Sequence, residues 1–584
     1  MKQLGFYVVM VAQVVSGWAL PAAERPNVIL IMTDDQGYGD IRSHGNPLID
    51  TPNLDQLASD GARFDRFFVS PLCAPTRASL LTGRYHVRTG TVNVSNNLEI
   101  MRADETTIAE LFGDNGYHTA LFGKWHNGEH YPNNPNGQGF DEFVGFCAGH
   151  IGNYFDPVLE HNSETIETEG FITDVLTEKA MEWIESKGDE PFLCYLPYNA
   201  PHTPYQVPDA YFDKYEGRGL DVKTSTLYGM VENIDDNVGR LLSKLTELGI
   251  DENTIVLFLT DNGPNTPDRY NAGMKGFKGR VDEGGVRVPL FVRWPGKISP
   301  GCVVEGLAAH IDLLPTLADL CGIAIPANLS LDGKSLKGAL LAEPVVAEDR
   351  LIFTHRWIMR RQPSNGAARS RRYRYVLTNR EESLFDLVQD PGQTTDISRE
   401  MPDQFQRHRD EYRQWFNDVF KNWEVESLIP CGYTQFPVTH LHAVQGKLTG
   451  TIRFHGKGFH HDWITNWTNA RDQIDWDIRV VEPGDYQVSV KYTCPESDVG
   501  SQIRISVDDQ DVTAIVEPAY DPDRFPNRDR APRSGELEKP WATLDIGTIS
   551  LNEGVAKLTL SADTMPGTQV MDVREVTLSK ITDK

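Results

Sequence analysis

One short stretch of the chain combines a thiol with small and basic residues: PLCAPTRASLLTGR, residues 71–84. It follows the apolar run 64–69, which has the length of a strand, and we expect a helix from Ala78 onward. Cys73 is therefore expected at a strand-to-helix junction, where unpaired backbone N–H groups favour a developing negative charge. For a Cys considered alone, the alternatives are a small buried apolar residue or a disulfide partner.

Oxygen-bearing side chains follow two apolar runs, residues 27–32 and 254–260, which we expect to be buried strands of a parallel sheet. Asp34 and Asp35 come after the first run, and Asp261 and Asn262 come after the second. Sheets of α/β proteins bind ligands at the carboxyl ends of their strands, and hard oxygen ligands suit Ca²⁺ or Mg²⁺. An isolated Asp pair would be interpreted as a helix cap or a turn, but the repeat of the pattern favours a metal site.

Basic and imidazole side chains follow further expected strands. Lys124 and His126 come after the run 118–122, and His202 comes after the run 191–198, in a loop that prolines stiffen on both sides. Lys278 belongs to a glycine-rich basic segment, residues 275–289. A surface lysine and a histidine at the edge of the core are the alternative for Lys124 and His126, and these two residues alone do not decide between the interpretations.

Length and charge limit the class of protein. A chain of 584 residues can hold two to four domains with a sizeable core. Its net charge of −27 argues against nucleic acid as the main partner, because no basic excess exists to displace counterions. The same overall field would repel an anionic substrate, so such a substrate requires a local cluster of cations at its site.

Residues 1–23 have the pattern of a secretory signal peptide: a charged start, the apolar run 4–20, and Pro21-Ala22-Ala23. No later run has the length of a membrane span. We therefore expect an exported protein, periplasmic or secreted. Export permits disulfides, but the seven Cys show no CxxC pair or zinc spacing, and their pairing stays open; Cys194 and Cys321 lie in runs typical of a core.

The order of the expected elements predicts three folded parts. Residues 24–340 alternate apolar strands with helices, as in an α/β domain, and residues 341–423 hold an antiparallel strand pair and a helix at 402–419. Residues 424–450 are expected to be a linker, and residues 451–584 a β-sandwich. The basic run 356–374 is interpreted as a solvated hairpin edge rather than a polyanion-binding face. For Trp463, Trp467 and Trp476, core packing is favoured over stacking on sugar rings.

Six segments in this order resemble the formylglycine-dependent (type I) sulfatase family over residues 27 to about 396: Asp34-Asp35, Cys73 to Arg77, Gly123 to His126, Pro201-His202, Asp261-Asn262-Gly263, and Lys278 with Glu283-Gly284-Gly285. The resemblance implies an alkaline-phosphatase-like fold, with a large mixed sheet flanked by helices and a small antiparallel α+β subdomain. It also implies a sulfuric ester hydrolase. In this family the motif Cys is oxidised to formylglycine, whose hydrate, a geminal diol, takes the sulfuryl group and then expels sulfate.

The resemblance assigns one Ca²⁺ to a set of five positions. These are Asp34, Asp35, Asp261, Asn262 and the modified Cys73.

The remaining roles that the resemblance implies concern charge and proton transfer. Arg77 and Lys124 would stabilise the formylglycine and the sulfate charge, and His126 would deprotonate the second hydroxyl. His202 and Lys278 would hold a sulfate oxygen and protonate the leaving alcohol. These roles meet the general demands of fixed cations at developing charge and of an acid near the leaving oxygen.

An exported acidic sulfatase with an accessory β-domain suggests a bacterial enzyme acting on a sulfated oligo- or polysaccharide. Its other partner would be the enzyme that matures Cys73 to formylglycine. The loop 147–156, with His150, is expected to line the sugar subsite.

Three other interpretations remain open from the sequence. A phosphonate or phosphate monoester hydrolase of the same fold would act on an ester that carries about one more charge near neutral pH. A two-zinc phosphatase is disfavoured because the additional His ligands are not evident at the matching positions. A sugar-binding protein with an inactive sulfatase domain would bind without turnover.

Overall fold

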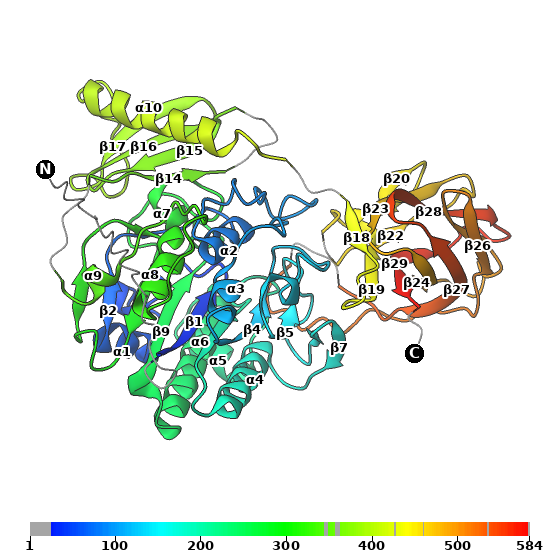
Figure 1. Cartoon of the computed structure of the whole chain (residues 1–584), viewed down its shortest axis with the longest axis horizontal. Coiled ribbons are helices and arrows are strands. Elements are labelled where there is room, and N and C mark those ends of the chain that lie inside the picture. The colour runs from blue at the N-terminus through cyan, green and yellow to red at the C-terminus, as the bar shows by residue number, and fades with distance from the viewer. Residues whose placement is uncertain are drawn as a thin grey trace, which may run out of the picture.

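The computed structural model describes residues 25–343, 349–356, 362–424, 428–459, 461–533 and 537–581. The expected signal peptide, residues 1–23, lies outside these ranges. Within the described ranges, no helix is both long and apolar enough to span a bilayer. Figure 1 shows a large α/β part, a small α+β unit beside it, and a β-sandwich on the other flank.

A ten-stranded mixed sheet forms the centre of the α/β part. β1 is parallel to both of its neighbours, β8 and β9, and β4 is parallel to β8 and β5, whereas β11 and the hairpin β6–β7 are antiparallel to their neighbours. All seven residues of β1 are buried, as its continuous apolar run predicts. In spatial order the strands are β12 (Cys302–Val304), β2 (Ala62–Phe64), β11 (Leu290–Arg293), β9 (Thr254–Thr260), β1 (Asn27–Thr33), β8 (Phe192–Pro197), β4 (His118–Lys124), β5 (Glu142–Phe146), β6 (Val158–His161) and β7 (Glu164–Glu167).

Helices cover both faces of this sheet, so the predicted α/β class is confirmed (Figure 1). Alternate residues of β1 point to opposite sides: Leu30 packs with α2 (Cys73–Thr82), α3 (Ile108–Gly113) and α8 (Leu313–Leu320). Ile29 packs with α1 (Pro52–Asp60), α4 (Ile172–Lys187) and α6 (Val222–Glu247). The smaller elements are α5 (Asp209–Glu216), α7 (Glu283–Val286), α9 (Lys337–Leu340), β3 (Phe67–Phe68), β10 (Arg287–Val288), β13 (Ala308–Ala309) and the 3₁₀ turns η2 (Arg42–His44), η3 (Asn136–Gln138), η4 (Asp251–Asn253) and η5 (His310–Asp312).

Two helix starts differ from the predictions. α2 begins at Cys73 and not at Ala78, because Pro75 lies in its first turn, where a missing N–H leaves no helical hydrogen bond unmade. The sequence pattern predicts a helix from Leu227 to Leu248, but α6 begins at Val222, five residues earlier, because the Asp221 carboxylate caps it by accepting from the Lys223 and Thr224 N–H groups at 3.1 Å.

The small α+β unit is a four-stranded antiparallel sheet with one helix laid across it (Figure 1). Its elements are β14 (Ile352–His355), β15 (Asn365–Arg369), β16 (Tyr373–Thr378), β17 (Glu381–Asp386) and α10 (Pro402–Val419). Two arginines of the basic run 356–374 are not at a solvated edge: Arg369 and Arg374 are buried, and both pair with Glu283 at 3.1 Å. Residues 357–361 lie outside the described part.

Two six-stranded sheets face each other in the C-terminal unit, so the expected β-sandwich is present. Trp467 and Trp476 are fully buried and Trp463 is 2% exposed, which confirms core packing for all three. One sheet contains β18 (Ile429–Cys431), β20 (Lys447–Thr449), β23 (Gln473–Val480), β25 (Gln502–Val507), β26 (Gln510–Ile515) and β28 (Gly554–Thr564). The other contains β19 (Val438–His442), β21 (Arg453–Phe454), β22 (Ile464–Thr465), β24 (Gly484–Thr493), β27 (Ala542–Leu551) and β29 (Asp572–Lys580).

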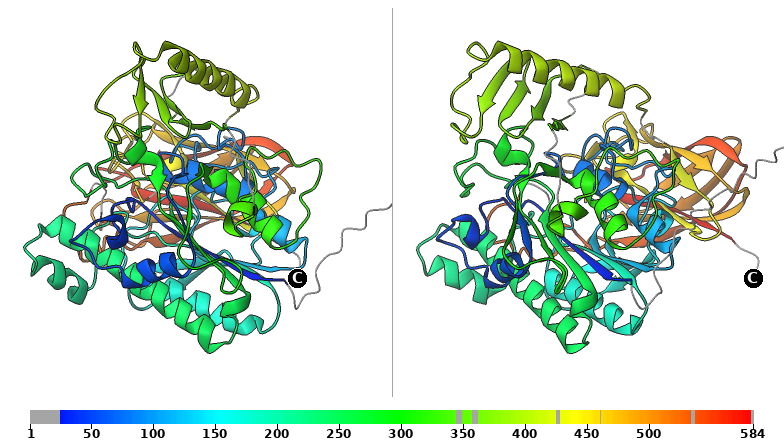
Figure 2. Two further views of the ribbon diagram at one scale, coloured as in Figure 1. Left: turned by 90° about the vertical axis from the view of Figure 1, so that its left-hand side faces the viewer. Right: turned by 60° about the vertical axis from the view of Figure 1, so that its left-hand side comes forward.

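The expected linker at 424–450 is wrong for most of its length. β18 and β20 pair with β23, β19 pairs with β29, and a 3₁₀ turn, η6 (Ala443–Gln445), joins β19 to β20. These strands have three to five residues each and give no sustained alternation of apolar and polar residues, so the sequence pattern did not reveal them. The sandwich therefore begins at about residue 429 and packs directly beside the α/β part (Figures 1 and 2).

Candidate active site

Four adjacent parallel strands, β9, β1, β8 and β4, deliver the candidate residues to one edge of the sheet. Their carboxyl ends carry, in that order, Asp261-Asn262, Asp34-Asp35, the loop with His202, and Lys124 with His126. The first turn of α2 brings Cys73 and Arg77 to the same place, and a loop before α7 brings Lys278. This is the position where an open α/β sheet leaves room for a ligand.

Arg77 and Lys124 form a buried network with two carboxylates. The Arg77 guanidinium lies 3.3 Å from Asp34 Oδ2 and 3.1 Å from Asp261 Oδ2, and its Nη1 donates to the Lys124 carbonyl at 2.7 Å. Lys124 Nζ pairs with the same Asp34 oxygen. Burial favours the neutral form of Asp34, but Lys124, His202 and Arg77 outweigh it and lower the pKa of this carboxyl. The site thus holds charges that are paired and fixed.

Asp35 collects a second set of contacts. It receives an N–H of Asn262 at 2.8 Å, pairs with Lys278 Nζ at 2.8 Å, and lies 3.7 Å from His202 Nε2. Its φ of 64° is in the left-handed region, which a residue with a Cβ rarely adopts. The strained backbone therefore aims this carboxylate toward Lys278 and His202.

The oxygens of these side chains suit a hard cation. Asp34 Oδ1 and Asn262 Oδ1 are buried without a hydrogen-bond partner, and ligand atoms of Asp34, Asp261 and Cys73 lie within 4.8 Å of one another. Burial and the charge of Asp34 raise the pKa of Asp261 above its ordinary value, because the carboxylates of the cluster repel one another. An oxygen-rich cluster of carboxylates and an amide fits Ca²⁺ or Mg²⁺ better than zinc.

Cys73 lies at the first helical position of α2 and is 2% exposed. Burial raises the pKa of its thiol, and Lys124 and Lys278 offset this only in part. The unmodified side chain is therefore a neutral thiol at neutral pH, and a neutral thiol is a weak nucleophile. All seven Cys are free thiols, and Cys194 and Cys321 are buried core residues as predicted.

Two imidazoles face this cluster from different loops. His126 has a φ of 64°, and its Nε2 donates to the Val94 carbonyl at 3.0 Å. A Cβ at Gly149 would lie 2.5 Å from this nitrogen, so only glycine lets the loop 147–156 pack here. His202 Nδ1 donates to the Thr203 carbonyl at 2.8 Å, which turns Nε2 toward Asp35.

Comparison with known proteins agrees with this geometry. The profile of the sulfatase family matches residues 26–323, more than half of the chain. This chain belongs to the sulfatase family.

Relatives and solved structures extend the match. Human arylsulfatase A is 36% identical over 375 residues, which cover 57% of this chain and 71% of the relative. N-acetylgalactosamine-6-sulfatase of the dog is 32% identical over 389 residues, covering 60% and 72%. The crystal structure of Ps i-CgsB in complex with k-i-k-neocarrahexaose is 31% identical with a TM-score of 0.64, covering 69% of this chain and 95% of that one. The chain is therefore a sulfatase, an enzyme that hydrolyses sulfate esters.

Two further profiles match, one that overlaps the end of the first and one in the C-terminal unit. One is described as N-sulphoglucosamine sulphohydrolase, C-terminal, and matches residues 277–414; the other is a domain of unknown function, DUF5077, which matches residues 455–523. The phosphonate monoester hydrolase of Agrobacterium radiobacter, at 21% identity and a TM-score of 0.54, shares the fold alone.

A cavity of about 280 Å³ opens above Cys73 in this sulfatase. Its floor is formed by Cys73, His126, His202 and Lys278, and the loop expected to line the sugar subsite contributes His150. The sequence did not predict the opposite wall, which belongs to the β-sandwich: Gly456, Lys457, Phe459, His461, Asp462 and Arg533. These residues are separated from Cys73 by more than 380 positions and have no local motif.

Supporting residues were missed as well. The Tyr154 hydroxyl lies 2.9 Å from the His202 carbonyl and 3.2 Å from the Thr203 carbonyl, so it holds the loop that carries His202. Arg269 pairs with Asp40 and donates to the Asp35 carbonyl at 2.9 Å, which supports the strained turn there. A buried tyrosine and a buried Arg–Asp pair carry no signal in a single sequence that separates them from ordinary core residues.

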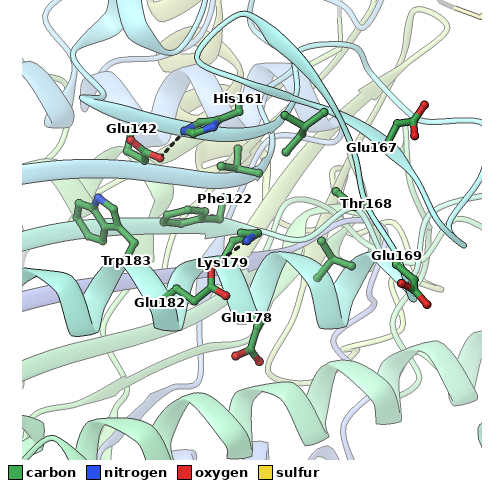
Figure 3. A pocket seen from close by; sticks show the side chains of 13 residues that line it. Phe122, Glu142, His161, Glu167, Thr168, Glu169, Glu178, Lys179, Glu182 and Trp183 are labelled. Atoms are coloured by element: carbon green, nitrogen blue, oxygen red, sulfur yellow. Dashed lines mark hydrogen bonds and ion pairs between the residues drawn. The ribbon is translucent and has the colours of Figure 1, made fainter.

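A larger groove of about 720 Å³ lies away from this site, between β5–β7 and α4 (Figure 3). Its cations are already paired: His161 lies 2.7 Å from Glu142, and Lys179 lies 2.9 Å from Glu182. Glu167, Glu169 and Glu178 add further negative charge (Figure 3). The groove would repel a sulfate ester and is not a substrate site.

Proposed function

We propose that this sulfatase removes sulfate from a saccharide, with a formylglycine made from Cys73 and one bound Ca²⁺. The observation that carries the proposal is a cavity lined by Cys73, Lys278 and two imidazoles, next to an oxygen-rich acidic cluster that pairs with Lys278 and with the buried Arg77 and Lys124. A sulfate ester needs fixed positive charge around its oxygens and an acid beside its leaving oxygen, and this cavity offers both.

Arg77, Lys124 and Lys278 would hold the sulfate. Their charges are fixed by Asp34, Asp35 and Asp261, so little reorganisation is needed when the anion arrives. The acidic partners raise the pKa of Lys278 despite its burial, so it stays charged throughout the working pH range.

His202 and His126 would move protons on the two sides of the sulfur. Because His202 Nδ1 donates to a backbone carbonyl, Nε2 is the nitrogen that can protonate the leaving alcohol. Because His126 Nε2 donates to Val94, Nδ1 is the basic nitrogen of its neutral ring and would accept a proton from the residue at position 73.

The two groups that the family implies fit the residues present. The buried oxygens of Asp34, Asp35, Asp261 and Asn262 would hold Ca²⁺, with the oxygen of the modified residue 73 as a fifth ligand. Formylglycine would supply a hydrated aldehyde with two hydroxyls on one carbon, so that one could take the sulfuryl group and deprotonation of the other could release sulfate.

A saccharide substrate is supported by the names of the relatives. One relative is named for N-acetylgalactosamine 6-sulfate, and one neighbour was solved with a carrageenan-type hexaose. Export in a bacterium and maturation of Cys73 by a formylglycine-generating enzyme belong to the same proposal.

The first test is the mass of the peptide that contains Cys73, in protein made by its native host or together with a maturation enzyme. Oxidation of the thiol to the aldehyde lowers this mass by roughly 18 Da. We expect the shifted mass in active protein, hydrolysis of 4-nitrophenyl sulfate well above that of 4-nitrophenyl phosphate, and loss of activity in Cys73→Ala. Cys302→Ala, which removes a thiol outside the cavity, is the matched control and should keep full activity. Full activity in Cys73→Ala would refute the mechanism.

A further inference from the structure

The β-sandwich forms one wall of the catalytic cavity. Two of its connections reach the cavity: residues 455–459 with 461–462, between β21 and β22, and Arg533, in the long connection between β26 and β27. This position differs from that of an accessory sugar-binding domain tethered by a linker. The same wall faces Cys73, His126 and His202 across a space of about 280 Å³.

The connection between β26 and β27 is fastened to the α/β part. Arg528 lies 3.2 Å from Asp156, the Arg530 N–H donates to the Tyr205 carbonyl at 2.9 Å, and Arg533 Nη1 donates to the Gly152 carbonyl at 2.9 Å. A surface ion pair alone contributes little to stability. The two hydrogen bonds to the carbonyls of Tyr205 and Gly152, however, hold this connection in place at the cavity. The wall is therefore part of the site in the folded protein.

His461 and Arg533 are engaged by the protein itself. His461 Nε2 donates to the His150 carbonyl at 2.5 Å, and its Nδ1 pairs with Glu538 at 2.6 Å. Burial favours the neutral form of Glu538, but His461, Arg574 and Arg533 lower its pKa to about 2, so it is ionised. His461 therefore contacts a backbone carbonyl through one ring nitrogen and a carboxylate through the other. Arg533 is held by Asp529 in the same way.

Lys457 differs from His461 and Arg533 in its contacts. It is exposed at the cavity, and no carboxylate of the described residues forms an ion pair with it. The loop that carries it is nevertheless fixed, because the Asp462 carboxylate accepts the N–H groups of Gly458 and Phe459. A Cβ at Gly456 would lie 2.5 Å from the same carboxylate. An unneutralised cation is thus held at a set place in a chain whose net charge is −27.

Phe459 stands beside Lys457 on the same wall. Phe459 is 40% exposed and lines the cavity, so its ring is accessible to a ligand there. Ligand sites typically combine such apolar surface with a few placed charges. The pair has the composition of a subsite for a sugar ring that bears an anionic group.

We propose that Lys457 and Phe459 are substrate-positioning residues: Phe459 contacts the face of the sugar ring, and Lys457 binds a second anionic group on the saccharide, besides the sulfate that is removed. The proposal rests on the proposed function and names its substrate class, a saccharide with a second sulfate or a carboxylate. Lys457 takes this role because Arg77, Lys124 and Lys278, which hold the reacting sulfate, are all paired with carboxylates of the floor.

The experiment measures competition against a small substrate. The assay substrate for the matured enzyme is 4-nitrophenyl sulfate, which has no second anionic group. D-glucosamine-2-N,6-O-disulfate, a sulfated disaccharide with a uronic acid, and N-acetylgalactosamine 6-sulfate are added as competitors. We expect Lys457→Met to raise the inhibition constant of the disulfate or of the uronic acid saccharide at least tenfold, and that of the monosulfate less than twofold. The two dianionic probes distinguish a second sulfate from a carboxylate. Phe459→Ala should raise the inhibition constants of all three competitors, because each of them has a sugar ring.

The control is Lys447→Met, a lysine of the same sandwich that pairs with Asp477 and lies outside the cavity; it should change none of these values. For 4-nitrophenyl sulfate, Lys457→Met should change kcat/KM by a smaller factor than it changes the inhibition constants of the dianionic competitors. The proposal would be overturned if Lys457→Met had the same inhibition constants as the wild type. It would also be overturned if the variant bound all three competitors more weakly by the same factor. If the matured wild type hydrolyses no aryl sulfate, the proposed function fails instead, and calorimetric binding of the same competitors to both forms still tests Lys457.

Discussion

His442 should make the docking of the β-sandwich sensitive to alkaline pH. It lies on β19 between Glu129 of the α/β part and Glu575 of β29, with Nε2 and Nδ1 each 3.1 Å from a carboxylate. Burial alone would lower its pKa, but the two carboxylates outweigh burial and raise the pKa to about 9. The other charged or titratable groups facing this cluster are His130, Glu160, His440 and Lys491.

The sign and size of the contribution of His442 to the free energy of unfolding follow from its pKa values in the folded and unfolded protein. Its pKa in the folded protein, about 9, lies above the ordinary 6.5, so its contribution is fully present below pH 6.5 and is lost as the pH rises through 9. The difference, at about 1.36 kcal/mol for each pH unit, is about 3.4 kcal/mol. The ring is 22% exposed, so solvent screening should reduce this to about 1–3 kcal/mol.

The assay is denaturant unfolding of the wild type and His442→Gln between pH 6 and pH 10. The free energy of unfolding of the wild type should fall by about 1–3 kcal/mol more than that of the variant, because the other titrating groups are common to both and cancel in the difference. His118→Gln is the control, since His118 pairs with Glu190 at an exposed position far from this cluster. Parallel pH profiles for the wild type and His442→Gln would refute the linkage.

Three further outcomes are expected. Trp476→Ala should destabilise the sandwich by about 3–5 kcal/mol in calorimetry, because it removes a fully buried ring and its hydrogen bond to the His442 carbonyl; a loss below about 1 kcal/mol would contradict the packing. Arg374→Met should cost about 3 kcal/mol in urea unfolding, because the buried Glu283 then keeps Arg369 at 3.1 Å and the more distant Arg287 at 4.0 Å; unchanged stability would show that the pair is not buried in solution. Chelation with EGTA should lower aryl sulfatase activity more than tenfold, with recovery on adding Ca²⁺ but not Zn²⁺; activity that persists in the chelator would speak against the metal proposal.

The sequence allowed prediction of what depends on local pattern and sheet topology. Asp34, Asp35, Asp261 and Asn262 follow continuous apolar runs, and the parallel pairing of β1 and β9 brings the ends of those runs together. The start of α2 was harder to predict, since a proline in the first turn reads locally as a break. The wall formed by Lys457 and Phe459 could not be predicted, because it depends on how two separately patterned units dock and leaves no periodicity in either.

The placement of that wall also sets an order of events during synthesis. Cys73 is 2% exposed, and one wall of its cavity is made of residues that are translated at least 383 positions later. The maturation enzyme that we propose would therefore meet a more open cysteine before the sandwich docks. At roughly 5–20 residues per second, the ribosome leaves this site open for roughly 20 to 80 s. The late position of the sandwich in the chain thus sets how long Cys73 would stay accessible for the proposed oxidation.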